Sequence, residues 1–562
     1  MKRFLVNSLW MIFAFQSGRM FAQPLPERIY VQTDKQMYLA GEPVWMKFFT
    51  TDSERLPMAY SKIAYAELVS DVTAVLQIKV ELSGGVGAGR MLLPADLASG
   101  YYRLIAYTQY MRNEGVDVFF EKTIAVLNTF LSGYQPETQD LKPSIVSEQP
   151  ETQDPKTETV SVRPDRETYA TRMRGELTIS GLPENIHTLS VSVAGKECIP
   201  LIESDASLYH KNLIKKSIAY SEDFLTEYEG HIVTGKLIHN QTGQPATNAA
   251  VSLPAGLSFP TGDGIRFFSG QRTGTDEVRF CTSGISGAHE IATVIFRTDD
   301  QYRVDVQSPF VARHTPKAMP ALQIHASHYD QLLDRSVALQ LFRYFSDDPS
   351  ETHSASPPHF KMKPTHTYRL DEYTRFTSMR EIFVEFISGA RFRRNAGKQE
   401  LSVFTKRGDV YEYGTLPLVL LDGVPLTDHE VIYNYDPLTV EKINIYYGPC
   451  ILGSHQFDGI VELVTYRRLH ADLNLNRSTQ IISYEGPQRP YHFNVPDHLK
   501  VQNRMPDGRH TLLWNPDVKA GGKASIRLPF DTSELTGEFH ATVEGITKDG
   551  AFIFATAWFH VE

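Results

Sequence analysis

Three hydrophobic segments in the last third of the chain have the pattern of β-strands. Residues 418–421 (LVLL) form a continuous apolar run, which predicts a strand buried on both faces. The Asp422-Gly423 pair that follows is a tight-turn signal, because glycine adopts positive φ without strain. Residues 440–446 (VEKINIY) and 460–466 (IVELVTY) alternate between apolar and polar positions, which predicts two half-buried strands.

This order of segments resembles the plug domain of TonB-dependent outer-membrane receptors. The resemblance rests on LDGVP at 421–425, VEKI at 440–443 and GIVELVTY at 459–466. In those receptors the plug lies inside a barrel formed by the same chain. Only 94 residues follow Arg468, whereas a barrel of about 22 strands of about 10 residues needs more than about 220. We therefore expect residues 368–468 to be a plug-like domain without a barrel of its own.

Residues 377–387 predict the helix of this plug-like domain. Ser378 can cap its N-terminus, and Glu381, three residues later, completes a capping box. A helix beside these strands makes the domain α+β.

Short alternating segments separated by Gly-rich turns predict an antiparallel β-sandwich in residues 27–129. Residues 28–47 (RIYVQTDKQMYLAGEPVWMK) and 99–113 (SGYYRLIAYTQYMRN) resemble the macroglobulin-type MG2 domain of bacterial α2-macroglobulin relatives and of large Bacteroidota surface proteins. We interpret Asp34 and Lys35 as a turn acid beside a solvated base.

A second macroglobulin-like sandwich is predicted in residues 160–229. The pattern of acid, base and tyrosine at residues 165–169 (DRETY) repeats that of residues 34–38 (DKQMY). Residues 205–229 are interpreted as a helical connector. The preceding residues 130–159 are rich in Pro, Glu, Gln, Thr and Asp, which predicts a flexible linker that cannot bury a core.

Residues 230–309 resemble the carboxypeptidase regulatory-like β-sandwich, through GKLIHNQTGQPA at 235–246. That resemblance implies a scaffold without catalysis. Residues 310–367 are interpreted as a connector with a helix at 331–345, whose apolar positions provide one buried face. Residues 483–562 predict a C-terminal Ig-like sandwich. The predicted fold class is therefore mainly β: a string of Ig-like or macroglobulin-like sandwiches plus one α+β plug-like domain.

Composition and the N-terminus indicate an exported protein. Residues 1–22 begin with Lys2-Arg3, followed by a short apolar run and small or polar residues ending at Ala22, which is typical of a secretory signal peptide. No later segment is long and apolar enough to span a membrane as a helix. The net charge of −10 and the lack of a basic stripe argue against nucleic-acid binding. We expect a location in the periplasm or at the outer membrane.

The sequence contains none of the common catalytic motifs. It has no GxSxG, HExxH, P-loop or CxxC pattern, and it lacks the GCGEQ-type thioester with which macroglobulins trap proteases. Cys198, Cys281 and Cys450 are far apart and are interpreted as buried free thiols, although one disulfide stays open as an alternative. We predict no enzyme activity and no cofactor.

Histidines gather between residues 325 and 366. His353, His359 and His366 could bind a transition metal together with the nearby pair His325 and His328. Their spacing fits no known metal site, so we interpret them as solvated linker residues and predict no metal.

Two classes of function are left. The first is a non-catalytic envelope protein whose plug-like domain docks on, or gates, a separate outer-membrane β-barrel of a transport or secretion complex. Its partner-binding candidates are Asp422, Gly423 and Gly459, whose alternative role is turn geometry. The second class is a thioester-less protease inhibitor or bait. A surface adhesion protein is a further alternative.

Overall fold

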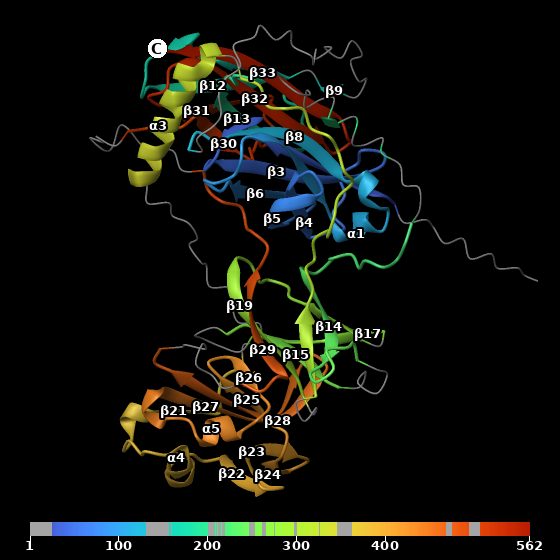
Figure 1. The fold of residues 1–562 in the computed structure, drawn as a ribbon, viewed down its shortest axis with the longest axis vertical. Helices are drawn as coiled ribbons and strands as arrows, with labels where there is room; N and C mark the ends of the chain where they lie inside the picture. The colour runs from blue at the N-terminus through green and yellow to red at the C-terminus, as the bar shows by residue number, and fades with distance from the viewer. Residues whose placement is uncertain are drawn as a thin grey trace, which may run out of the picture.

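The computed structural model describes residues 25–130, 157–158, 160–199, 208, 209, 211, 215, 220–246, 253–260, 266–274, 276–296, 301–324, 326–345, 362–467, 475–493 and 506–562. The predicted signal peptide and most of the predicted linker lie outside these residues. The fold is mainly β, as the alternating patterns predict. It forms two lobes, which are joined by extended segments (Figure 1).

The first sandwich of the upper lobe, sandwich A, is built from consecutive residues. One sheet has the order β1-β3-β6 and the other the order β2-β8-β7-β4-β5. The strands are β1 (Glu27–Thr33), β2 (Met37–Leu39), β3 (Pro43–Asp52), β4 (Ile63–Ser70), β5 (Thr73–Glu81), β6 (Val86–Leu92), β7 (Gly100–Tyr107) and β8 (Phe120–Leu127); α1 (Gln109–Arg112) and the 3-10 turn η1 (Val116–Val118) precede β8. Apolar side chains from both sheets form one core.

The second sandwich of the upper lobe, sandwich B, combines segments from both ends of the chain. Its sheets have the orders β10-β12-β31 and β11-β33-β32-β13-β30, and β9 also pairs with β33. The strands are β9 (Thr157–Glu158), β10 (Ser161–Pro164), β11 (Thr168–Tyr169), β12 (Arg174–Ser180), β13 (Ile186–Gly195), β30 (Thr511–Asn515), β31 (Ser525–Asp531), β32 (Gly537–Thr547) and β33 (Phe552–Val561).

This arrangement differs from the separate sandwiches that the sequence predicts for residues 160–229 and 483–562. Strand β13 pairs with both β30 and β32, and β12 pairs with β31 over seven residues. The strands between residues 160 and 199 are too few to cover both faces of a core. The C-terminal strands supply the missing faces, and the two segments share one hydrophobic cluster.

The lower lobe begins with sandwich C, which also takes a distant strand. Its sheets have the orders β17-β18-β14-β20 and β16-β15-β19-β29. The strands are β14 (Ile232–His239), β15 (Ala255–Ser258), β16 (Phe267–Ser269), β17 (Gln271–Thr273), β18 (Glu277–Cys281), β19 (Ala288–Ile295), β20 (Tyr302–Val306) and β29 (Thr479–Glu485). The sequence predicts this sandwich within residues 230–309, but β29 comes from residues far outside that range. Most of β29 also lies before residue 483, where the C-terminal sandwich is predicted to begin.

The rest of the lower lobe is an α+β unit, unit D, at residues 362–467. Its sheet has the order β22-β23-β27-β28-β25-β26; β21 also pairs with β27, and β24 with β23. The elements are β21 (His366–Arg369), η4 (Leu370–Glu372), α4 (Met379–Glu385), β22 (Ala390–Asn395), β23 (Lys398–Arg407), β24 (Val410–Gly414), β25 (Leu418–Leu421), β26 (Val424–Leu426), α5 (Glu430–Tyr433), η5 (Pro437–Thr439), β27 (Val440–Leu452) and β28 (His455–Thr465).

Strand β25 is buried on both faces, as its continuous apolar run predicts. Val419 and Leu421 join the core of unit D. Leu418 and Leu420 join a second cluster that contains Phe267 of sandwich C. The second cluster is an interface between the two units, so the apolar run fixes unit D to sandwich C.

The described helices confirm two predictions and correct a third. Helix α3 (Tyr329–Phe345), which the short 3-10 turn η3 (Ala326–His328) precedes, covers the helix predicted at 331–345. Helix α4 is capped by Ser378, whose Oγ accepts a hydrogen bond from the Glu381 amide. The helical connector predicted at 205–229 is not continuous, because residues 220–230 are irregular. Their polar groups bond to sandwich A instead, as with the Ser221 amide and Asn113.

Candidate functional site

The Asp422-Gly423 turn, a predicted partner-binding candidate, lies against sandwich C of the same chain. Both residues have positive φ, 49° and 83°, as the hairpin between β25 and β26 requires. The Asp422 carboxylate accepts hydrogen bonds from the Thr465 amide (2.7 Å) and hydroxyl (2.6 Å). The Ser258 hydroxyl of sandwich C donates to the Gly423 carbonyl (2.8 Å). Asp422 is only 5% exposed, so it presents little surface to a second protein.

Gly459, the third candidate, lies at the other end of the β25–β28 pairing. Strand β25 pairs with β28 from Leu418 opposite Ile460 to Leu421 opposite Leu463, so the structure does not bring the three candidates together. Gly459 has a φ of 153°, and a Cβ there would lie 2.6 Å from Val403 Cγ1. Its place in the fold requires glycine for close packing.

A buried group of charges joins sandwich A, sandwich B and α3. This charge cluster consists of Asp34, Lys35, Glu42, Glu197 and Arg335. Lys35 Nζ lies 3.2 Å from Glu42 Oε2 and 3.5 Å from Asp34 Oδ2. Arg335 Nε (3.1 Å) and Nη2 (2.8 Å) donate to the two carboxylate oxygens of Glu42, and the Leu39 amide donates to Glu42 Oε2 (3.2 Å). The five side chains come from segments up to about 300 residues apart in sequence.

This cluster corrects the interpretation of Asp34 and Lys35 as a turn acid and a solvated base. Asp34 is 1% exposed and Lys35 is 6% exposed. Asp34 Oδ1 does accept the hydrogen bond from Tyr38 that a local turn provides (2.8 Å). Its other oxygen accepts from the Thr511 hydroxyl of β30 (2.6 Å), which also accepts from Lys35 Nζ (3.1 Å). Sandwich B therefore covers this turn and contributes directly to its hydrogen bonds.

Glu197 is the least satisfied member of the cluster. Neither of its carboxylate oxygens has a hydrogen-bond partner among the described residues, and Arg335 Nη1 is 3.9 Å away. Burial raises the pKa of Glu197 to about 7, although the charges of Arg335 and Lys35 oppose this shift. For Glu42 burial also opposes ionisation, but Arg335 and Lys35 outweigh it and lower the pKa to about 2. The cluster thus holds one firmly ionised glutamate and one that titrates near neutrality.

We expect Glu197→Gln to stabilise the protein at pH 8. The folded-state pKa of Glu197 lies above its ordinary value of 4.5, because burial favours the neutral carboxyl group. The stability that this neutral group contributes is complete below pH 4.5 and is lost as the pH rises through about 7. Glutamine removes a buried charge whose ion pair with Arg335 is long (3.9 Å), and burying such a poorly compensated charge costs roughly 1–3 kcal/mol. Urea unfolding at pH 5 and pH 8 should show a gain for the variant at pH 8 and little difference at pH 5. Glu184→Gln, at an exposed glutamate, is the control. An equal effect at both pH values would contradict the assignment.

A second buried network joins the two lobes. Glu227 and His231, which lead into β14, contact Tyr65 of sandwich A. The Tyr65 hydroxyl donates to the Glu227 carboxylate at 3.0 Å, and His231 Nδ1 lies 2.8 Å from Glu227 Oε1. His231 Nε2 is 3.5 Å from Lys79 Nζ of β5. Burial lowers the pKa of Lys79 to about 8 and lowers that of His231 from its ordinary value. All four side chains are buried, so the network has no surface for a substrate.

Three segments that run between the lobes pass over sandwich A at this network, and we name the region the junction. The Gln488 amide donates to the Lys79 carbonyl (2.7 Å), and the Gln488 carbonyl accepts from the Glu81 amide (2.9 Å). Both partners belong to β5. The Val311 amide donates to the Tyr107 hydroxyl (3.0 Å), and the Asn113 side chain donates to the Phe224 carbonyl (2.8 Å). The junction therefore fixes segments 220–231, 307–317 and 486–493 to one sandwich.

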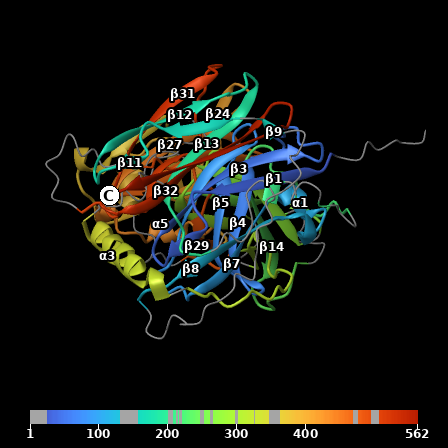
Figure 2. The same ribbon diagram turned by 90° about the horizontal axis from the view of Figure 1, so that it is seen from above.

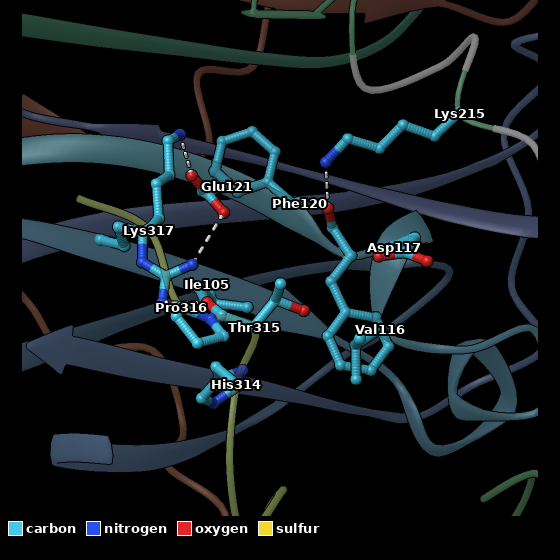
Figure 3. Close-up of a pocket in the computed structure, with 12 residues that line it drawn as sticks. Ile105, Val116, Asp117, Phe120, Glu121, Lys215, His314, Thr315, Pro316 and Lys317 are labelled. Atoms are coloured by element: carbon cyan, nitrogen blue, oxygen red, sulfur yellow. Dashed lines mark hydrogen bonds and ion pairs between the residues drawn. The ribbon is translucent and has the colours of Figure 1, made fainter. Parts of the chain in front are cut away.

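A cavity of about 240 Å³ lies beside the junction on sandwich A (Figure 3). The Glu121 carboxylate accepts from Lys317 Nζ (2.5 Å) and Arg103 Nη1 (3.4 Å), and Lys215 Nζ donates to the Phe119 carbonyl. Burial lowers the pKa of Lys215 to about 8. Glu121 is therefore paired with Lys317 and Arg103, while Lys215 is held by a backbone carbonyl.

Helix α4 and strands β22, β23 and β24 of unit D form the lower end of the molecule (Figure 1). Val384 of α4 is 71% exposed, and Val410 and Tyr411 of β24 are 67% and 54% exposed. The neighbouring strands β22 and β23 carry six Lys or Arg residues and one Glu. We name these exposed elements the distal surface. Sequence reasoning missed it, because these apolar residues lie on one short helix and one strand, and no local pattern marks them as exposed.

The predicted metal and thiol residues form no site among the residues described. His353, His359 and His325 lie outside them, and no group of three His, Cys, Asp or Glu side chains within them could hold a metal ion. All three cysteines are free; Cys450 is buried as predicted, whereas the other two are partly exposed. Within the described part of the chain, no helix is long and apolar enough to cross a membrane.

No protein-family model and no curated protein matches this sequence. Among solved structures, Salmonella α2-macroglobulin reacted with methylamine is 9% identical, with a TM-score of 0.24 and coverage of 96% of this chain. Escherichia coli α2-macroglobulin in its native conformation gives the same identity, TM-score and coverage. The chain spans about 40% of the length of these two proteins. At TM-scores this low, the similarity does not establish a common fold.

Proposed function

We propose that this chain is a non-catalytic envelope protein that docks on a separate outer-membrane β-barrel through the distal surface of unit D. The plug resemblance of residues 421–466 suggests the class of partner. The observation that carries the proposal is the exposure of Val384, Val410 and Tyr411 at the end of the molecule farthest from the upper lobe. Solvent-exposed apolar side chains on one end of a fold are typical of a protein-interaction surface.

The position of the plug-like turn supports this choice of surface. The Asp422-Gly423 turn contacts sandwich C and is buried, so it is not free to meet a barrel. The four elements of the distal surface carry seven Lys or Arg and four Glu, a positive balance on a chain whose net charge is −10, which would complement acidic groups on a partner. The upper lobe and sandwich C would act as spacers. A thioester-less protease inhibitor stays a second hypothesis, on the MG2-like motif of residues 28–47 alone.

Purification of the tagged protein from detergent-solubilised outer membranes, after cross-linking, tests the proposal. We expect an outer-membrane barrel to be recovered with the wild type and to be lost with Val410→Asp/Tyr411→Asp. Both residues are exposed, so the variant should keep its thermal unfolding midpoint. Val75→Asp, at an exposed valine of sandwich A, is the matched control and should retain the partner. Recovery of the protein alone, or of the same partner with the double variant, would overturn the proposal.

A further inference from the structure

Strand β24 is an edge of the unit D sheet, and among the described residues it pairs with β23 alone. Because β22 and β24 both pair with Val403, they flank β23 on opposite sides. The Phe404 amide donates to the Gly389 carbonyl (2.8 Å), on the β22 side. Phe404 and Tyr413 are therefore a non-hydrogen-bonded pair of the β23–β24 ladder, and the main-chain groups of Tyr413 point outward. Those of Tyr411, two residues earlier, point the same way.

Several other edge strands of this chain are protected against pairing with a further strand. Strand β22, at the same end of the sheet, carries three arginines, and β26, at the other end, carries Pro425. In the upper lobe, β31 contains Pro529, and the edge of β5 is bonded to Gln488. Proline and charged residues are common ways to protect an edge. Strand β24 (VYEYG) has no proline, lysine or arginine, and its pairing with β23 has no bulge.

The outer residues of β24 belong to an aromatic surface. The Tyr413 ring lies 4.4 Å from that of Phe404, and the Tyr447 ring lies 5.5 Å from Phe404 and 6.1 Å from Tyr411. We name these four residues the tyrosine face. Seen along the long axis, β24 lies on the same side of the molecule as β12 and β31, rather than beneath its centre (Figure 2). Tyr411 is 54% exposed, so a strand added to β24 would cover an aromatic ring that is now largely in solvent.

The tyrosine face is lined by basic side chains without acidic partners. The Arg391 guanidinium lies 3.7 Å from the centre of the Tyr413 ring. Lys406 is exposed and belongs to the same face by register. Among the described residues, neither cation forms an ion pair. On the other face of the hairpin, Arg407 is already paired with Glu412 (2.9 Å). An added strand with acidic side chains toward the tyrosine face would therefore meet two cations that are not neutralised.

A second copy of this chain is a poor occupant of this edge. Pairing of two β24 strands would bring Arg391 and Lys406 of both copies to one interface, where like charges oppose association. An extended segment of a different protein with acidic side chains has the complementary charge. Its backbone also matches the outward N–H and C=O groups of β24, because a strand is bonded at its edge by another strand.

We infer that β24 binds an extended acidic segment of the partner as an added β-strand. The main-chain groups of Tyr411 and Tyr413 would bond to the backbone of that segment, and its acidic side chains would lie over the tyrosine face. The partner's identity as an outer-membrane barrel rests on the proposed function, whereas the mode of binding rests on the geometry and charge of β24.

Proline at residue 411 tests the outward main-chain groups. In Tyr411→Pro the missing N–H is one that faces away from β23, so the hairpin keeps its own hydrogen bonds. Tyr411→Ala is the matched control, since it removes the same phenol and keeps the N–H. The barrel recovered with the wild type should bind Tyr411→Pro at least about tenfold more weakly than Tyr411→Ala. Equal affinities would overturn strand addition and leave docking intact. A wild type that recovers no barrel would overturn the proposed function, and the inference with it.

Hydrogen exchange of the full wild-type chain gives a readout that needs no variant. The amides of Tyr411 and Tyr413 should exchange at least about tenfold more slowly in the complex than in the free protein, because an added strand accepts hydrogen bonds from them. The amides of Val410 and Glu412 face β23 and should change little. Unchanged exchange at residues 411 and 413 in the complex would contradict the inference, even if Tyr411→Pro failed to fold.

Charge reversal tests the acidic character of the bound segment. Lys406→Glu should weaken the complex at least about tenfold at low salt, and added salt should reduce the difference from the wild type. Lys548→Glu, at an exposed lysine of the upper lobe, is the control and should bind as the wild type does. Wild-type affinity in Lys406→Glu would show that the segment that binds β24 is not acidic.

Discussion

Replacement of Arg335 by leucine is expected to destabilise the upper lobe by about 3–5 kcal/mol and to release helix α3. The guanidinium of Arg335 donates to both oxygens of Glu42 and to the Met37 carbonyl (3.2 Å), and it is the nearest cation to Glu197. Leucine matches the apolar surroundings but leaves the buried carboxylates with Lys35 as their remaining cation in the charge cluster. The cost comes from the unpaired charges, because buried carboxylates cannot regain their hydration.

Urea unfolding followed by tryptophan fluorescence measures this loss, and limited proteolysis reports the release of α3. Arg380→Leu, at an exposed arginine of α4, is the control and should change stability by less than about 0.5 kcal/mol. Adding Glu42→Gln to Arg335→Leu should restore part of the loss, because it removes a charge that the first change left unpaired. A loss below about 1 kcal/mol for Arg335→Leu would show that the cluster does not hold α3.

Replacement of Glu227 by alanine is expected to loosen the two lobes relative to each other. The Glu227 carboxylate accepts hydrogen bonds from Tyr65, from the Ile232 amide (2.8 Å) and from the His231 ring. Alanine leaves these buried groups without their acceptor, which costs roughly 1–3 kcal/mol for each group that stays unpaired. Since Tyr65 belongs to sandwich A and Ile232 to sandwich C, the loss falls on the junction between the lobes.

Small-angle X-ray scattering should show a larger radius of gyration for Glu227→Ala. Hydrogen exchange should rise in segments 220–231 and 486–493, which pass through the junction. Glu222→Ala, at an exposed glutamate five residues earlier, should match the wild type in both measurements. An unchanged radius of gyration together with unchanged exchange would mean that the other backbone contacts of the junction suffice to hold the lobes.

Local sequence patterns predicted the strands and turns of this protein well. The run at 418–421 is a strand buried on both faces, and the turn after it has positive φ at Asp422 and Gly423. Ser378 caps α4 as its spacing to Glu381 indicates. Each of these features depends on residues within a few positions of one another, and so a local pattern is sufficient to predict it.

The assignment of strands to sandwiches could not be read from the chain. Strands β13 and β30 are more than 300 residues apart, and β19 pairs with the distant β29. The alternation of apolar and polar residues indicates that a strand has one buried face, but it does not indicate which other strand pairs with it. The predicted partner-binding turn failed to reach the surface for the same reason: its cover, Ser258 of sandwich C, is about 165 residues away in sequence.

The turns at residues 34–38 and 165–169 have related sequences but different burial. Comparing them shows which features follow from the local sequence and which follow from the tertiary structure. In both, a tyrosine hydroxyl donates to the aspartate four residues earlier, at 2.8 Å for Tyr38 and 2.7 Å for Tyr169. The sequence by itself determined this local geometry, because the bonded groups lie within one turn. Only the tertiary structure made Asp34 part of a buried charge cluster while Asp165 stayed exposed, because burial depends on which distant segments pack over the turn.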